Sequence, residues 1–341
     1  MKKLVLAVLL MVILALGVGA ALYQEELQTP YPESTTSQII EISRGAGFRE
    51  VVGLLEERKV IRNRYVVMAY LIQSGLRSRL QAGEYQFDHP MTPVEVIRRI
   101  ANGNVLLHKF TVAEGLTVAG TALKWEEQGY GKAEEFAAAA ASLVGSIRDL
   151  DPDASSVEGY LYPETYSFPS RTSAKQVVEA MVSRFRAVVA AIEKEVPRGQ
   201  WPLSLRETVI LASLVESEAA TAVERPLVAS VYFNRIRRGM LLQCDPTVIY
   251  ALEREGRYRG RLLLVDLKFP SSYNTYVHPG LPPGPIMNPG FPSLRAAVQP
   301  PPTPSLFFVR TVDGRHKFST TLAEHNRAVA EYRVLQRQQK K

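Results

Sequence analysis

The stretch "TVILASLVESEAAT", residues 208–221, is an apolar run that carries two glutamates, Glu216 and Glu218, two positions apart. Just before it, Ser204 and Glu207 have the spacing of a capping box, which starts an α-helix. The run therefore predicts a helix in the core of a folded domain. It also raises the question of what two acidic side chains do at the end of such a helix.

The two glutamates point in nearly opposite directions on an ideal helical wheel, which advances about 100° per residue. Glu218 falls within about 20° of the mean direction of the apolar residues, and Glu216 falls about 180° away. Apolar surroundings raise the pKa of a carboxyl group and make it a usable general acid, so Glu218 is the candidate acid. Two alternatives stay open: the helix end frays Glu218 into solvent, or Glu218 pairs with an arginine such as Arg225.

The composition indicates a folded protein of two or more domains, because 341 residues with 46% apolar and 22% charged side chains can bury a sizeable core. A single cysteine, Cys244, excludes an intramolecular disulfide, and the Cys and His spacings of a zinc site are missing. We therefore expect neither a metal nor a cofactor.

The N-terminus, "MKKLVLAVLLMVILALGVGAALYQEEL" (1–27), reads as a membrane anchor. Two lysines precede an uncharged run from Leu4 to Gln24, which is long enough to cross about 30 Å of hydrocarbon as a helix. A cleaved signal peptide is the alternative, since residues 19–21 are small, but signal cores usually span only about 7–15 residues. Lysines before the run and glutamates after it place the N-terminus in the cytoplasm and the rest of the chain outside the membrane.

The net charge of +7 indicates an acidic neighbour. Nucleic acid is excluded as a partner if the body of the chain is exported, which leaves the anionic cell wall; an ordinary solvated basic surface is the alternative. Residues 28–38, "QTPYPESTTSQ", read as a linker after the anchor.

An internal echo follows the linker. "IEISRGAGFREVVGLLEE" from Ile40 and "FTVAEGLTVAGTALKWEE" from Phe110 each predict a strand, a glycine turn and a helix that ends in paired glutamates. A β, α, α, β order around residues 38–88 predicts a small α+β module at 39–104, and such modules commonly bind ligands. The second copy, at 105–144, connects this module to the rest of the chain.

Residues 145–341 are mainly helical by pattern. They include a long loop rich in Pro, Gly and Tyr at 268–293 and a hairpin at 306–319 with Asp313 and Gly314 in the turn. The expected fold class is therefore α+β: an N-terminal transmembrane helix, a small α+β module, and a mainly helical domain with a C-terminal β-hairpin.

Tyrosines and amides near these elements are candidates for binding sugars, because tyrosine combines an apolar face with a polar tip. The candidates are Tyr273, Asn274 and Tyr276 in "SSYNTY", Tyr162 and Glu164 in "EGYLYPETY", and Gln243 in "LLQCDPTVIY". Ordinary half-buried packing is the alternative for the tyrosines. For Asp245 and Pro246, a turn is the simpler interpretation.

These stretches resemble the endolytic murein transglycosylases, the YceG-like family. The similar blocks are "LASLVESEA", "RPLVASVYFNRIRRGMLLQCDPTVIY", "YNTY…GLPPGPIMNPG" and "HKFSTTLAEHN", in the order of that family, and the likeness extends over nearly the whole chain. The resemblance implies that 39–104 is a LysM-like peptidoglycan-binding module and that 145–341 is the catalytic domain. It places the catalytic glutamate at the second Glu of its block, which is Glu218.

The activity implied by the resemblance is cleavage of the β-1,4 bond between N-acetylmuramic acid and N-acetylglucosamine without water, which leaves a 1,6-anhydro end. The substrate's own 6-hydroxyl then takes the role of the second carboxylate that ordinary glycosidases use. The enzyme would cut nascent glycan strands beside the peptidoglycan synthases, the penicillin-binding proteins. The alternatives are a non-catalytic peptidoglycan-binding scaffold and a two-carboxylate hydrolase that uses Glu216 or Glu164.

Overall fold

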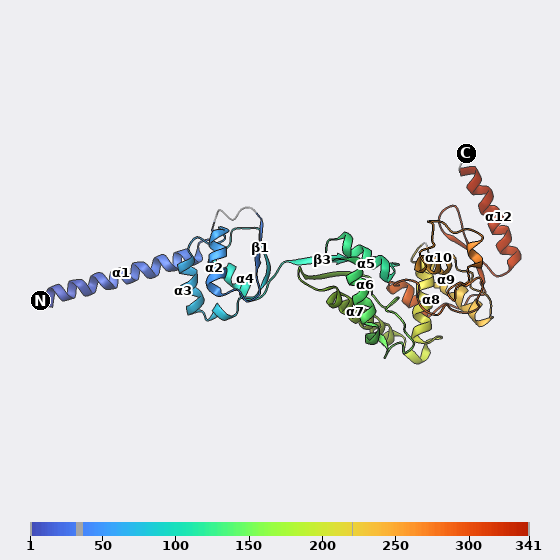
Figure 1. The fold of residues 1–341 in the computed structure, drawn as a ribbon, viewed down its shortest axis with the longest axis horizontal. Coiled ribbons are helices and arrows are strands. Elements are labelled where there is room, and N and C mark those ends of the chain that lie inside the picture. The colour runs from blue at the N-terminus through green and yellow to red at the C-terminus, as the bar shows by residue number, and fades with distance from the viewer. Residues whose placement is uncertain (1, 32–36, 220, 340–341) are drawn as a thin grey trace. The chain divides into compact units, whose positions relative to one another are not determined.

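The computed structural model describes residues 2–31, 37–219 and 221–339, and the chain divides into two compact units (Figure 1). Unit 1 comprises residues 1–109 and 167–172, and unit 2 comprises residues 110–166 and 173–341. The helix-rich α+β class is confirmed. Residues 110–144, part of the segment that we expected to connect two domains, belong to unit 2.

Unit 1 is a helical layer on a two-stranded sheet. Its elements are α1 (Lys2–Gln28), β1 (Gln38–Ile42), α2 (Phe48–Glu57), α3 (Arg64–Gln73), the 3₁₀ turn η1 (Leu76–Ser78), β2 (Gly83–Phe87) and α4 (Pro93–Ala101). Strands β1 and β2 are antiparallel, with Gln38 opposite Phe87 and Ile42 opposite Gly83. Their inward residues, including Tyr85 and Phe87, pack against apolar faces of the helices. The predicted β, α, α, β order is confirmed; the likeness to LysM stays a prediction.

Helix α1 is long and apolar enough to cross a membrane. Its C-terminal end is attached to the rest of unit 1, because Leu27 is buried and Glu26 pairs with Arg62 at 3.3 Å. The predicted linker, 28–38, lies partly outside the described residues: Gln28 still belongs to α1, Gln38 begins β1, and residues 32–36 are not described.

The internal echo is confirmed. Both copies form a strand, a turn and a helix: β1 with α2, and β3 (Leu107–Thr111) with α5 (Val118–Glu127). The turn glycines, Gly45 and Gly115, adopt φ values of 83° and 80°, a left-handed conformation that favours glycine. Strand β3 pairs with β4 (Thr165–Pro169), and the boundary between the units runs through these two strands.

Unit 2 holds the helix from which the sequence analysis started. Its remaining elements are α6 (Ala133–Ser142), η2 (Val144–Ile147), α7 (Ala174–Glu195), η3 (Arg198–Gln200), α8 (Leu205–Glu218), α9 (Arg225–Arg237), α10 (Asp245–Arg254), η4 (Asp266–Lys268), α11 (Phe291–Val298), β5 (Phe307–Arg310), β6 (His316–Ser319) and α12 (Leu322–Gln339). The hairpin β5–β6 is antiparallel and turns at Gly314, as predicted. The segment that we interpreted as a turn, Asp245-Pro246, instead begins α10, because proline is well suited to the first turn of a helix.

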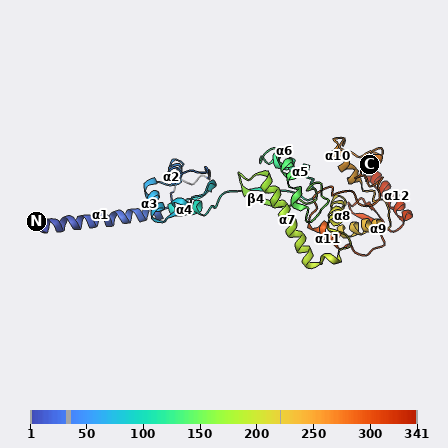
Figure 2. The same cartoon turned by 60° about the horizontal axis from the view of Figure 1, so that its bottom comes forward.

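Helix α8 is the centre of unit 2 and contacts α9, α10 and α11 (Figure 2). Ser204 and Glu207 form the predicted capping box at its start. Residues 208–215 are all buried, so the helix has no solvent face over two turns, and the single apolar stripe of the wheel is wrong there. Burying a leucine such as Leu211 or Leu214 stabilises the fold by about 1.5–3 kcal/mol.

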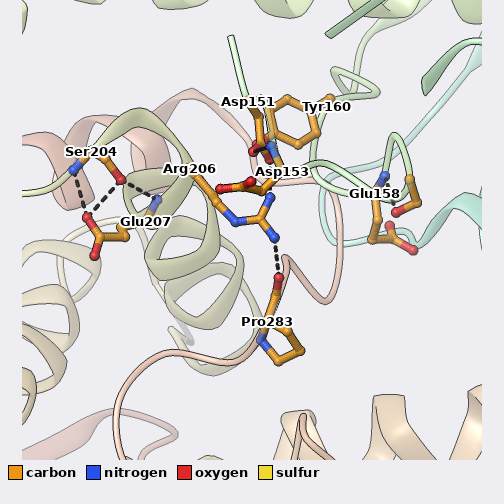
Figure 3. Close-up of polar contacts among 9 residues, drawn as sticks. Asp151, Asp153, Glu158, Tyr160, Ser204, Arg206, Glu207 and Pro283 are labelled. Carbon is orange, nitrogen blue, oxygen red and sulfur yellow. Dashed lines mark hydrogen bonds and ion pairs between the residues drawn. The ribbon is translucent and has the colours of Figure 1, made fainter. Parts of the chain in front are cut away.

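The start of α8 is also fixed by a buried polar group (Figure 3). Asp151 is fully buried. It accepts a hydrogen bond from the Tyr160 hydroxyl at 2.7 Å and forms an ion pair with Arg206. The same guanidinium donates to the carbonyl of Pro283 in the long loop. Arg206 thus ties the helix to the loop that follows Phe269.

Candidate active site

Glu218 is the last residue of α8 and lies beside a cavity of about 720 Å³. The helix ends there because Ala219 adopts an extended conformation (ψ 115°), while its N–H still donates to Val215 O at 2.9 Å. Glu218 Oε1 lies 3.5 Å from Cys244 Sγ, within reach of a weak thiol hydrogen bond. The carboxyl is therefore held at the helix end and faces the cavity.

The surroundings of Glu218 raise its pKa above the ordinary value for glutamate. Burial is the main cause, and the negative charge of Asp245 adds to it; hydrogen bonding from Cys244 and the positive charge of His316 act in the opposite direction. A carboxyl group of this kind keeps its proton closer to neutral pH, which is what a general acid requires. The location and the direction of the pKa agree with the sequence prediction, whereas the catalytic role itself stays a prediction.

The cavity is assembled from segments far apart in the sequence. Besides Glu218, its wall includes Tyr232 and Arg235 of α9, Gln243 and Asp245 before and at the start of α10, Tyr276 of the long loop, Phe308 to Arg310 of β5, His316 of β6 and His325 of α12. Arg235 is buried and donates to the carbonyls of Leu306 and Leu242 at 2.7 and 2.8 Å. Its guanidinium thereby joins α9 to the hairpin and to the segment before α10.

Glu216 has a different environment, although it lies only two residues from Glu218. Its side chain is 5% exposed and pairs with Arg225 at 2.8 Å, and its second oxygen accepts the Gly290 N–H at 3.0 Å. Arg225 also donates to Ser293 at 2.9 Å. The arginine that we considered as a partner for Glu218 therefore binds Glu216, which fixes the end of α8 to α11 and to the segment before it.

One imidazole of the cavity wall, that of His316, is held by the buried carboxylate of Glu224. Glu224 accepts the His316 backbone N–H at 2.7 Å, and its other oxygen lies 3.1 Å from His316 Nδ1. This contact orients the imidazole and leaves Nε2 as the nitrogen available to the cavity. His325 lies nearby, stacked on Phe307 with 5.3 Å between ring centroids.

The three candidate residues of the long loop lie in different environments. Tyr276 lines the cavity of Glu218, and its hydroxyl donates to Asp245. Asn274 is fully buried, donates to Phe269 O at 2.8 Å and accepts the Tyr276 N–H at 2.9 Å, so its amide shapes the loop. Tyr273 turns away from this cavity and packs on Tyr250 at 5.0 Å between centroids.

Gln243 is exposed on the cavity wall. Its backbone adopts a left-handed conformation (φ 53°), which is unusual for a non-glycine residue, and its N–H is fixed by Thr275 O at 3.1 Å. Gln243, Tyr276 and Glu218 are thus brought together around one cavity.

Tyr162 and Glu164 are placed elsewhere. Both contact Arg184: Glu164 pairs with its guanidinium at 2.6 and 3.0 Å, and the guanidinium carbon lies 5.7 Å from the centroid of the Tyr162 ring. Neither residue lines the cavity of Glu218.

Comparison with known proteins decides the family. A profile of the YceG-like family matches residues 40–331. The chain belongs to this family. It is 32% identical to an endolytic murein transglycosylase of Bacillus subtilis (strain 168) over 331 residues, which cover 92% of this chain and 90% of that relative. An endolytic murein transglycosylase of Streptococcus pneumoniae (serotype 2, strain D39) is 25% identical over 362 residues, covering 97% of this chain and 65% of that relative.

A solved structure agrees with the family assignment. The 2.6 Å crystal structure of a YceG-like protein from Listeria monocytogenes is 31% identical to this chain, with a TM-score of 0.58. The match covers 86% of this chain and 99% of the solved one.

Several cavity residues of this YceG-like chain were not predicted as site residues. Tyr232 and Arg235 of α9 and His316 of β6 line the cavity, and Cys244 contacts Glu218. The four residues come from three separate segments, and no local pattern marks these segments as neighbours. The blocks that carry the family resemblance do include all four, and that was the available signal. Within the described ranges, no group of three or more His, Cys, Asp or Glu side chains is arranged to hold a metal ion.

Proposed function

We propose that this protein is a membrane-anchored, endolytic lytic transglycosylase of peptidoglycan with Glu218 as its catalytic acid and base. The observation that carries the proposal is a glutamate of raised pKa at the end of a buried helix, facing a cavity of about 720 Å³. Membership in the YceG-like family, and relatives of 32% and 25% identity that are named endolytic murein transglycosylases, support it.

The reaction follows from one carboxyl group and the chemistry of the substrate. The protonated Glu218 gives its proton to the oxygen that links N-acetylmuramic acid to N-acetylglucosamine, and the bond from C1 to that oxygen breaks. The 6-hydroxyl oxygen of the same muramyl residue then closes onto C1, and its proton passes to the Glu218 carboxylate. The product is a 1,6-anhydro end, no water is consumed, and Glu218 regains its proton.

A single carboxyl group suffices because the nucleophile is already attached to the reacting sugar. Intramolecular groups held in position reach effective molarities of about 10⁵ M or more. A hydrolase would need a second acid to serve as nucleophile or to activate water. Glu216 and Glu164, the acids considered for that role, are both paired with arginines and lie off the cavity wall, which disfavours the hydrolase.

The remaining parts of the chain fit an enzyme that works on new cell wall at the membrane. Helix α1 would anchor the protein with its N-terminus in the cytoplasm, and residues 39–104 would bind peptidoglycan as a LysM-like module. Cuts made close to the membrane would end the growth of nascent strands, beside synthases of the penicillin-binding class. Gln243 and Tyr276 would contact the sugar next to Glu218, and Asn274 would hold the loop in place. Tyr162 and Glu164, which do not line this cavity, would contact more distant parts of the glycan strand.

The test is product analysis with the full chain in detergent. We expect the wild-type protein to release anhydro-ended muropeptides from murein, detected by chromatography and mass spectrometry, and Glu218→Gln to release none. Glu127→Gln, a change at an exposed glutamate of α5, is the matched control and should act like the wild type. Glu127→Gln should unfold like the wild type, and Glu218→Gln should unfold cooperatively and be at least as stable, because the substitution replaces a buried acid of raised pKa by a neutral side chain.

The alternatives give different products. A non-catalytic scaffold would bind murein and release nothing, with or without Glu218. A hydrolase would leave reducing ends and incorporate oxygen from ¹⁸O-labelled water; Asp245, the other acid on the cavity wall, would then be the second carboxylate to examine. Anhydro product that persists in Glu218→Gln would remove Glu218 from the mechanism.

A further inference from the structure

A second cavity, of about 490 Å³, lies in unit 2 and takes no part in the chemistry proposed for Glu218. Its floor is made of small apolar side chains at the start of α5 and along α6, among them Ala119, Ala137, Ala140 and Ala141. Its other wall carries Glu158, Tyr273 and three residues from the end of α10: Tyr250, Glu253 and Arg254.

The same two segments of the chain, α10 and the long loop, line both cavities. Asp245, at the first residue of α10, lines the cavity of Glu218, whereas Arg254, at its last residue, lines the second cavity. Nine residues of helix separate them by about 13 Å. The loop repeats this arrangement: Tyr276 lines the first cavity and Tyr273 the second. The second cavity therefore lies about one length of α10 from the cavity of Glu218.

The charges on the second cavity are suited to a ligand with both signs of charge. The Arg254 guanidinium carbon lies 5.8 Å from the Tyr250 ring centroid and 5.2 Å from that of Tyr273. Arg254 also hydrogen-bonds to Tyr273, and its charge acts on Glu158, but none of the ion pairs among the described residues includes it. Glu253 stands beside it on the same rim, exposed to solvent. The rim thus offers a cation for a carboxylate and an anion for an amine.

Glu158 adds a buried acid to the wall. Its side chain accepts the Val118 N–H at 3.0 and 3.2 Å and the Tyr250 hydroxyl at 3.3 Å, so it fixes the start of α5 against α10. It lies on the same segment between η2 and β4 that carries the buried Asp151 (Figure 3). Glu158 therefore fixes the two parts of the cavity wall, α5 and α10, relative to each other.

The same arrangement disfavours a sugar as the ligand. A sugar stacks on a free aromatic face, and here the arginine already lies over both tyrosine rings. An alanine-lined floor instead fits small methyl groups, and the paired charges of the rim fit free carboxylates and amines. The short peptides on the muramyl residues of murein have this chemistry: they are rich in alanine and carry a diamino acid and free carboxylates.

We propose that the second cavity binds the peptide attached to the muramyl residue of the strand being cut. The proposal rests on the proposed function, because the peptide reaches the cavity only when its sugar lies at Glu218. An extended peptide spans about 3.4 Å per residue, so four residues cover the length of α10. The site would make the enzyme prefer strands that still carry their peptides.

The experiment compares two substrates with one enzyme: glycan strands that carry peptides, and the same strands after enzymatic removal of the peptides. The quantity measured is the ratio of kcat/KM for the two. We expect the wild-type ratio to be about ten or more, as a charge-assisted contact would give. Ala141→Phe, which places a bulky ring at the edge of the cavity, and Arg254→Ala should both bring the ratio close to one.

The matched control is Ala138→Phe, an equal change at an exposed position of the same helix that does not line the cavity, and it should keep the wild-type ratio. A wild-type ratio of one would overturn the peptide site, while cleavage of both substrates would leave the proposed function intact. Equal losses on both substrates in Ala141→Phe would likewise overturn it, because the cavity would then serve folding only. Absence of cleavage in the wild type would contradict the proposed function itself.

Discussion

Glu158 allows a quantitative prediction about stability and pH. Burial of its side chain raises its pKa from the ordinary 4.5 to about 7, although the Val118 N–H, the Tyr250 hydroxyl and the charge of Arg254 act against the rise. The folded state therefore holds this proton more tightly than the unfolded chain does. The stabilisation is complete below pH 4.5 and is lost as the pH rises through about 7.

The size of the effect follows from the two pKa values. At about 1.36 kcal/mol per pH unit, the interval from 4.5 to about 7 corresponds to about 3 kcal/mol. For a folded unit of this size, such a loss lowers the melting temperature by about 6–12 °C. Other groups titrate over the same range, so the prediction concerns the difference between the wild type and Glu158→Gln, whose side chain stays neutral throughout.

Both tryptophans of the chain, Trp125 and Trp201, belong to unit 2, so their fluorescence reports the unfolding of the unit that contains Glu158. Urea unfolding followed by this signal should show the wild type losing about 3 kcal/mol more than Glu158→Gln between pH 4 and pH 8. Glu134→Gln, at an exposed site on α6, should behave like the wild type. Equal pH dependence in the wild type and Glu158→Gln would refute the reasoning. A steeper loss in the variant would mean that the folded state stabilises the Glu158 anion.

Two further predictions concern the end of α8. Arg225→Met leaves the buried carboxylate of Glu216 without its cation and should lower the free energy of unfolding by about 3–5 kcal/mol, with partial recovery in the double variant with Glu216→Gln; a loss below about 1 kcal/mol in urea unfolding would contradict this. Asp245→Asn removes a negative charge that raises the pKa of Glu218, so the loss of activity toward high pH should begin at a lower pH. A pH–rate profile of kcat/KM checks this. If the decrease at high pH begins at the same pH as in the wild type, or at a higher one, the prediction is wrong.

The features that the sequence predicted correctly depend on local patterns. The two strand-turn-helix units, the capping box at Ser204 and the hairpin turn at Gly314 are each decided within one short stretch of the sequence. Asp245-Pro246 shows the limit of such reasoning. The pair is compatible with both a turn and a helix start, and only the packing of α10 on α8 separates the two.

The cavity around Glu218 could not be predicted from the sequence, because the residues that form its walls are far apart along the chain. Cys244 and His316 lie 26 and 98 residues beyond Glu218, and their approach depends on how α9, α10 and the hairpin pack. The tyrosine loop was predicted as one binding element, yet Tyr273 and Tyr276 line different cavities, because the buried Asn274 turns the chain between them. Residue type indicated the chemistry of the loop but not the direction of each side chain.

The helical wheel distinguished Glu216 from Glu218, but the structure shows a different physical reason for the distinction. It assumed one buried face, whereas α8 is buried all round through Val215, and both glutamates meet protein atoms. What distinguishes them is the partner. Glu216 contacts a guanidinium and a backbone N–H, which together fix the helix end. Glu218 has a thiol, a tyrosine and a nearby negative charge, which leave its neutral form favoured by burial. The ion pair of Glu216 thus holds the helix end in place, and in the proposed mechanism Glu218 keeps its proton there until a glycosidic oxygen takes it.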